Sequence, residues 1–180
     1  MSLSDSDLIA RVLVSDDRHA FGELVKRNHS ALRGFLRGLT KGDHALADDL
    51  AQEALIEAYR CLSRFEGGSS FSTWLLGIAY NRFRSHQRRR REEPIDTREE
   101  HPSADAPVQA DHRPATEAGV DLEAALQSLC PEEQAALRLC YREGLSHDEA
   151  AALMSCPLGT LKTHLLRAKE RLRTLLQAYA

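Results

Sequence analysis

Four side chains near the C-terminus have the types and spacing needed to read DNA without covalent chemistry. If residues 157–175 form a helix, a turn of about 100° per residue gathers them on one side. They are Lys162, Thr163, Leu166 and Arg167. Such cations can contact phosphates and guanine edges in a major groove, and an apolar tip can contact a thymine methyl group. The opposite side is an apolar stripe, which predicts burial. It consists of Leu158, Leu161, Leu165, Ala168, Leu172 and Leu175.

The residues just before this helix predict a second, shorter helix. Ser146-His147-Asp148-Glu149 fits a capping box, in which the Ser146 and Glu149 side chains bond each other's backbone amides. The short helix should run near 147–154, and Pro157 is tolerated at the first position of the next one. Two helices joined by a turn of about three residues form a helix-turn-helix, in which the second helix is the recognition helix. The alternative is an ordinary amphipathic helix pair in a bundle.

A second basic segment lies in the middle of the chain. Six arginines and no acid occur between residues 82 and 91, behind the glycine-serine loop Phe65-Glu66-Gly67-Gly68-Ser69-Ser70. Arginines neutralise phosphates, and small polar groups beside aromatic rings can hold an unstacked base. These residues therefore suit single-stranded or melting DNA. The alternatives are a solvated helix end or a site for RNA or another polyanion, and Trp74 is assigned first to the core.

An acidic patch is predicted on an earlier helix. Asp49, Gln52 and Glu53 are spaced i, i+3 and i+4, so they share one helical face. The patch fits either a docking site for a basic partner or an ordinary solvated surface.

The elements that position these residues are all predicted to be helical. Apolar periodicity indicates helices near 4–14, 17–39, 43–63, from about 70 onwards, 121–129 and 131–143, before the helix-turn-helix. Residues 94–121 contain four of the six prolines and few large apolar residues, which is typical of a flexible linker. The segment 92–121 has nine acids and two arginines, a net charge of −7. We expect an all-α protein with two small domains, 1–93 and 122–180, around this acidic linker.

Composition narrows the classes of function. The chain has 180 residues and is 42% apolar, without a run long enough to span a membrane or an evident secretory signal, so a cytoplasmic location is expected. The four cysteines form no metal-type cluster, which favours reduced, buried thiols over a redox sensor. There is no phosphate loop, nucleophile motif or metal spacing. We therefore expect neither an enzyme nor a cofactor.

Taken together, these segments resemble the extracytoplasmic-function group of bacterial sigma-70-type sigma factors. The resemblance covers nearly the whole chain outside the linker. The similar stretches are AFGELVKR…DDLAQEALIEAY, FSTWLLGIAYNRFRSHQRRR and LSHDEAAALMSCPLGTLKTHLLRAKERLR. A helix-turn-helix alone would be weak evidence, whereas all three stretches in this order are specific.

The resemblance implies a role for each group of residues. The acidic patch matches a DxxQE motif that docks on the β′ clamp helices of RNA polymerase, and the C-terminal domain would contact the β flap. The loop from Phe65 to Phe71 and Asn81 match a pocket for a flipped base of the −10 element, with the adjacent DNA backbone contacted by Arg82, Arg84, Arg88 and Arg89. Lys162, Thr163, Leu166 and Arg167 match the positions that read the −35 element. The group also implies control by an anti-sigma factor.

Two other functions are compatible with parts of the sequence. A free-standing helix-turn-helix repressor or activator would use residues 121–180 and leave the loop, the arginines and the acidic patch without a role. A sigma mimic that titrates an inhibitor would have no need of Lys162, Arg167 or the arginine run. Co-purification with core polymerase would separate the first of these alternatives from a sigma factor.

Overall fold

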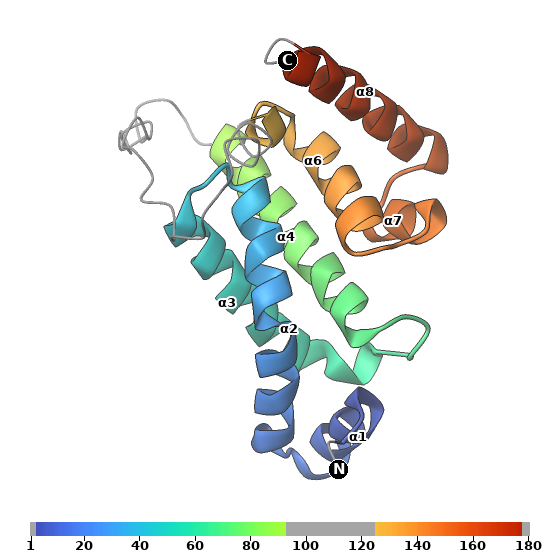
Figure 1. The fold of residues 1–180 in the computed structure, drawn as a ribbon. Coiled ribbons are helices and arrows are strands. Elements are labelled where there is room, and N and C mark those ends of the chain that lie inside the picture. Colours follow the sequence, from blue (N-terminus) through green and yellow to red (C-terminus); the bar gives the residue numbers. More distant parts are fainter. Residues whose placement is uncertain (1–2, 93–124, 178–180) are drawn as a thin grey trace.

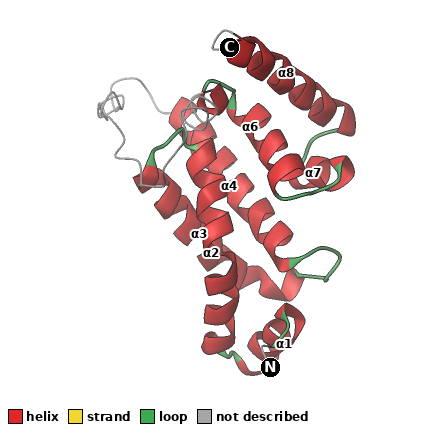
Figure 2. Ribbon diagram, in the orientation of Figure 1, coloured by secondary structure: helices red, strands yellow, loops and turns green. Residues whose placement is uncertain are grey.

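The computed structural model describes residues 3–92 and 125–177, and every regular element in these ranges is a helix (Figure 1, Figure 2). The prediction of an all-α chain is confirmed. The predicted linker, residues 94–121, lies outside the described residues. So do the first residues of the helix predicted over 121–129, of which residues 125–127 are described and helical.

The described N-terminal part contains four α-helices. They are α1 Asp5–Ser15, α2 Arg18–Leu39, α3 His44–Cys61 and α4 Phe71–Glu92, with a 3-10 turn at Leu62–Arg64 after α3. Each of the first three begins after a side chain that accepts hydrogen bonds from its first turn, which satisfies amides that have no partner within the helix. These caps are Ser4, Asp17 and Asp43.

Helix α2 is the centre of this part. It packs against α1, α3 and α4, and it contributes large apolar side chains that are fully buried. Those at 0% exposure are Leu24, Leu32, Phe35 and Leu36. Because α3 and α4 bury their apolar sides against α2, their polar sides face outward. The acidic patch and the arginine run therefore lie on outer surfaces.

The described C-terminal part is built around the helix-turn-helix. Its helices are α6 Pro131–Leu137, α7 His147–Leu153 and α8 Leu158–Gln177. The single helix predicted over 131–143 is α-helical only as far as Leu137, and Arg138–Arg142 form a π-helical turn after it. The Glu143 amide donates to the Arg138 carbonyl at 3.0 Å, a bond between residues five apart. Pro157 lies one residue before α8, which differs slightly from the predicted first helical position.

The capping box at the start of α7 is confirmed. The Glu149 amide donates to Ser146 Oγ at 3.2 Å, and the Ser146 amide donates to Glu149 Oε2 at 2.8 Å. The Ser146 hydroxyl also donates to the same carboxylate, and these bonds hold the pKa of Glu149 below its usual value. The box fixes where the first helix of the helix-turn-helix begins.

Removing this cap should cost measurable stability. We expect Ser146→Ala to lower the free energy of unfolding by about 1 kcal/mol, because the first turn of α7 loses its acceptor. Urea denaturation at neutral pH measures the change. Ser146→Thr keeps the hydroxyl and serves as the control, so it should retain most of the wild-type value. Equal losses in both variants would mean that the cap contributes nothing.

The two described parts pack directly on each other. Helix α6 contacts α2, and α7 contacts α4 (Figure 1). Buried apolar residues of both parts form one continuous cluster. The sequence predicts two separate helical units but contains no signal for this contact between them.

Candidate nucleic-acid interface

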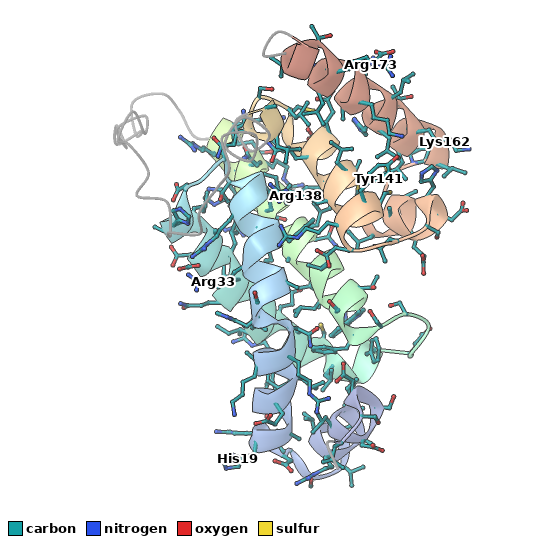
Figure 3. All side chains as sticks on the ribbon, in the orientation of Figure 1. His19, Arg33, Arg138, Tyr141, Lys162 and Arg173 are labelled. Atoms are coloured by element: carbon teal, nitrogen blue, oxygen red, sulfur yellow. The ribbon has the colours of Figure 1, made fainter. Side chains whose placement is uncertain are left out.

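Helix α8 separates a buried side from an exposed one, as its sequence predicts. Leu161, Leu165 and Ala168 are at most 4% exposed, and they face the rest of the C-terminal part. The exposed side carries the four candidate DNA-reading residues, Lys162, Thr163, Leu166 and Arg167. Figure 3 shows Lys162 at the outer edge of the molecule, near the start of α8. The helix therefore offers cations and an apolar tip on one accessible surface.

Two of these side chains show how the exposed side of α8 is arranged. Leu166 is 59% exposed, whereas Leu161 and Leu165 of the same helix are buried. The Thr163 hydroxyl donates to the Gly159 carbonyl at 2.9 Å, one turn earlier in the same helix. Lys162 and Arg167 carry the positive charge of this surface.

The turn before α8 is tightly defined. Ser155 has a φ of 51°, in the left-handed region that a residue with a side chain adopts at some cost. This conformation lets the Cys156 amide donate to the Ala151 carbonyl at 3.0 Å, which closes the end of α7. The turn thus sets the angle at which α8 leaves α7.

The loop before α4 rests on a cluster of aromatic rings. The ring centroids of Phe65 and Phe71 are 6.2 Å apart, and that of Trp74 lies 5.4 Å from Phe65 and 5.8 Å from Phe71. Phe71 is 2% exposed, so its ring belongs to the support of the loop. Trp74 packs against the core as predicted. Gly67 and Gly68 of the loop are exposed. The serine hydroxyls are engaged locally, because Ser70 Oγ accepts from the Thr73 amide at 3.0 Å and Ser69 Oγ donates to the Ser70 carbonyl at 3.4 Å.

The arginine run on α4 is only partly free. Arg82 forms an ion pair with Glu57 of α3, and Arg84 Nη1 donates to the Met154 carbonyl at 3.3 Å. Arg88 lies within 3.8 Å of Glu92 one turn later, with both side chains largely exposed. Arg89 is exposed. The ion pair and the hydrogen bond depend on other elements, so the run of arginines in the sequence does not predict them.

Asn81 is exposed but is not next to the loop along the helix. It lies ten positions after Phe71, the first residue of α4. A rise of 1.5 Å per residue places it about 15 Å farther along the helix axis. A single strand that crosses this surface would therefore meet the loop and Asn81 at different nucleotides.

The acidic patch is brought together on the outer face of α3. Asp49, Gln52 and Glu53 are all exposed. The neighbouring acid Asp48 is separate from the patch, because it pairs with Arg33 of α2 at 2.5 Å and this guanidinium lowers the pKa of the carboxyl. Ile56, which the sequence does not single out, is 53% exposed one turn after Glu53. In the sequence, its position beside the patch is indicated only by its spacing, which is i+3 from Glu53 and i+4 from Gln52.

Nothing in the described chain suggests covalent chemistry. In residues 3–92 and 125–177, no group of histidine, cysteine or acidic side chains could hold a metal ion. None of the described helices has the length and apolarity that a membrane crossing requires. The four cysteines are free and half-buried, and burial raises the pKa of the thiols of Cys130, Cys140 and Cys156. These three thiols thus stay protonated at neutral pH, which does not favour a redox sensor.

Comparison with known proteins gives two family matches. Residues 24–93 match the family model described as sigma-70 region 2, and residues 119–172 match the model described as sigma-70, region 4. The chain is 35% identical to the RNA polymerase sigma-H factor of Pseudomonas aeruginosa, over 96% of this chain and 94% of that protein. It is 32% identical to the ECF RNA polymerase sigma-E factor of Escherichia coli K12, over 93% and 92% respectively.

Solved structures with a similar fold include a sigma factor and the protein CnrH. The sigma factor RpoE of Bartonella quintana, in complex with the anti-sigma factor NepR, has a TM-score of 0.73 and 32% identity. The match covers 87% of this chain and 96% of that one. CnrH, in complex with the cytosolic domain of CnrY, has a TM-score of 0.68 at 24% identity, covers 98% and 99%, and supports the fold alone.

Proposed function

The chain belongs to the extracytoplasmic-function group of sigma-70-type RNA polymerase sigma factors. We propose which of its residues bind the −35 element, the −10 element and core polymerase. Proteins of this kind initiate transcription by binding and perform no covalent chemistry themselves. The observation that carries the proposal is the exposed surface of α8, where Lys162, Thr163, Leu166 and Arg167 stand opposite the buried stripe.

The C-terminal part would read the −35 element. Helix α8 would enter the major groove, with Lys162 and Arg167 on phosphates or guanine edges. The 59% exposed Leu166 suits contact with a thymine methyl group. The buried stripe of α8 keeps the helix in place on α6 and α7 while the opposite surface meets DNA.

The N-terminal part would bind the −10 element as it opens. The loop Phe65–Phe71 would hold an unstacked base above its aromatic support, and Asn81 would contact a neighbouring nucleotide of the same strand. Arg82, Arg84, Arg88 and Arg89 would follow the backbone. Unstacking a base costs a few kcal/mol, which these contacts and the neutralised phosphates would offset.

The outer face of α3 would dock on core polymerase. Asp49, Gln52 and Glu53 offer hydrogen-bond acceptors to a basic surface such as the β′ clamp helices. Ile56 would add an apolar contact beside them, which gives the docking face a partly desolvated centre. The C-terminal part would contact the β flap, so that the enzyme sets the distance between the two DNA-reading surfaces.

Regulation by an anti-sigma factor is part of the proposal. The support is that RpoE of Bartonella quintana, 32% identical in sequence, is described in complex with an anti-sigma factor. We further propose domains 1–93 and 122–180 joined by 94–121, and a site of action in the cytoplasm, where the polymerase works.

Run-off transcription tests the proposed function. Core polymerase supplied with this chain should produce promoter-specific transcripts from fragments of the host genome, and core polymerase alone should not. Binding of the chain to promoter DNA without polymerase should be weak, because two tethered surfaces gain effective concentration only when their spacing is set. Tight specific binding of the free chain without stimulated transcription would instead identify a free-standing repressor or activator.

Loss of the Asn81 side chain should affect DNA opening selectively. We expect Asn81→Ala to lower the yield of permanganate-reactive open promoter about 3- to 10-fold, the equivalent of one lost hydrogen bond. Binding to core polymerase in a pulldown should not change. Gln87→Ala, a polar residue farther along α4, is the matched control. Equal losses of opening and polymerase binding would contradict the assignment of Asn81 to DNA.

A further inference from the structure

Three arginines surround a hollow between the end of α3 and the middle of α4, which we call the arginine pocket. Its volume is about 300 Å³, and it is lined by Glu57, Arg60, Cys61, Arg64 and Arg82. Arg60 and Arg64 are exposed, so the pocket is open to solvent. Three guanidinium groups and one carboxylate give it a formal charge of +2. The pocket suits a compact anion, because sites for larger organic ligands begin at about this volume.

One of the three arginines has an acidic partner in the free protein. The Arg82 guanidinium forms an ion pair with the Glu57 carboxylate, which joins α4 to α3. The Arg82 side chain is still 35% exposed, so a competing anion can reach it. Exposed ion pairs contribute little to stability, and exchanging one acidic partner for another therefore costs little. Glu57 thus holds Arg82 in place without closing the pocket.

The arginine pocket lies between the two places that the proposed function assigns to bases. Arg64 directly precedes the loop that begins at Phe65, and Arg82 directly follows Asn81. Asn81 lies about 15 Å along α4 from the start of that helix. A single strand that contacts both the loop and Asn81 must carry its backbone across this interval. Each nucleotide brings one negative charge, so a phosphate has to pass close to the three arginines.

The charge of the neighbouring docking face favours DNA over a protein as the source of the anion. Arg60 follows Ile56 by four residues, so it lies on the same side of α3 as the acidic patch. A partner surface that docks on this patch must itself be basic, and such a surface does not neutralise arginines. A DNA strand beside it does. Charge complementarity therefore assigns the pocket to the DNA backbone.

We propose that Arg60, Arg64 and Arg82 bind one backbone phosphate of the opened −10 strand, and that Glu57 takes the place of this phosphate in the free protein. This inference deepens the proposed function and rests on it. When the strand enters, its phosphate replaces the Glu57 carboxylate on Arg82, and the other two guanidinium groups complete the site. Arginine suits the exchange, because its planar donors match carboxylate and phosphate alike. The site positions the strand between its two base contacts and reads no sequence itself.

Neutralising single phosphates tests the site directly. The protein is the full chain bound to core polymerase, and the DNA is a fork junction with an unpaired −10 strand. One linkage at a time is replaced by an uncharged methylphosphonate. For the wild type, we expect a linkage between the two base contacts at which the replacement weakens binding about 10-fold. In the double variant Arg60→Ala with Arg64→Ala, the same replacement should have little further effect, because its partners are already lost.

The salt dependence of the same binding gives a second measurement. The double variant should lower the slope of log affinity against log salt by about 0.7, the value for one phosphate of a single strand. Arg11→Ala with Lys26→Ala is the matched control, since it removes the same charge from exposed ion pairs of α1 and α2. The control should keep the wild-type slope and methylphosphonate profile. Equal effects of the two double variants would overturn the proposal, because net charge alone would then explain them.

A charge-removing change at Glu57 tests whether its carboxylate substitutes for the phosphate. In Glu57→Gln, Arg82 is free before the DNA arrives, so affinity for the fork junction should rise about 2- to 5-fold. In an Arg82→Ala background, Glu57→Gln should bring no such gain. An affinity of Glu57→Gln at or below that of the wild type would refute the role of Glu57.

Binding to core polymerase separates DNA from protein as the source of the anion. In a pulldown, the Arg60→Ala and Arg64→Ala variant should bind core as the wild type does. Weaker core binding with an unaltered methylphosphonate profile would assign the pocket to an acidic polymerase surface and overturn the proposal. If the wild-type complex binds the fork junction but no linkage couples to the arginines, the proposal alone fails. If the wild-type complex binds no promoter DNA, the proposed function fails and the phosphate site fails with it.

Discussion

Alanine at both Lys162 and Arg167 should weaken binding of the polymerase-bound protein to its promoter about 30- to 1000-fold. We expect each lost cation contact to cost about 1–2 kcal/mol, in the lower part of the range of about 1–3 kcal/mol for a good contact to a base edge, so two lost contacts give about 2–4 kcal/mol. The slope of log affinity against log salt should also fall, by about 1 for each of the two cations that neutralises a phosphate. Fluorescence anisotropy with a promoter duplex at several salt concentrations measures both quantities.

A second double variant on the same helix controls for net charge. Lys169 and Arg173 are exposed residues of α8 nearer its C-terminal end than the four candidate DNA-reading residues, and the Lys169 ammonium lies 4.9 Å from the ring centre of Tyr141. Figure 3 shows Arg173 near the other end of α8 from Lys162. Lys169→Ala with Arg173→Ala removes the same charge, so it should change affinity much less. Equal effects would mean that α8 attracts DNA by charge alone and that another surface reads the sequence.

Alanine at Asp49, Gln52 and Glu53 together should lower affinity for core polymerase about 100-fold or more. A hydrogen bond to a charged group contributes about 1.5–3 kcal/mol, and the triple variant removes two carboxylates and an amide from the docking face. All three side chains are exposed on α3, so their loss leaves the apolar core intact. A competition assay with labelled wild-type protein and core enzyme measures the change.

The control for this variant removes two acids from other surfaces. Glu23 of α2 is half-exposed in a surface ion pair with Lys26, and Glu170 of α8 is exposed. Glu23→Ala with Glu170→Ala should leave core binding unchanged. If the triple variant binds core as the wild type does, the acidic patch is an ordinary solvated face.

The sequence predicts well the features that depend on local spacing. The capping box at Ser146, the buried stripe of α8 and the shared face of the acidic patch all follow from residues three or four positions apart. Such residues are neighbours on any helix, whatever lies around it. The helices predicted in the N-terminal part are present for the same reason, because the apolar spacing and the capping residues that predict each helix lie within its own segment.

The features that the sequence does not predict depend on distant neighbours. Arg82 and Arg84 belong to one basic run, yet the first pairs with Glu57 and the second bonds the Met154 carbonyl. From the sequence alone, Gly38 is only a residue of low helix propensity, whereas in the structure the Arg138 side chain lies against it. Such pairings require knowing which helix lies beside which, and periodicity within one segment contains no information about that.

The bond from the Thr163 hydroxyl to the Gly159 carbonyl limits what this residue can recognise. Its only hydroxyl proton is committed to the helix, so the oxygen can accept a hydrogen bond from the amino group of adenine or cytosine but has no proton for a purine N7 or a guanine O6. On the proposed DNA-reading surface, discrimination of guanine would thus be left to the two cationic side chains, while the threonine methyl would add to the apolar contact proposed for Leu166.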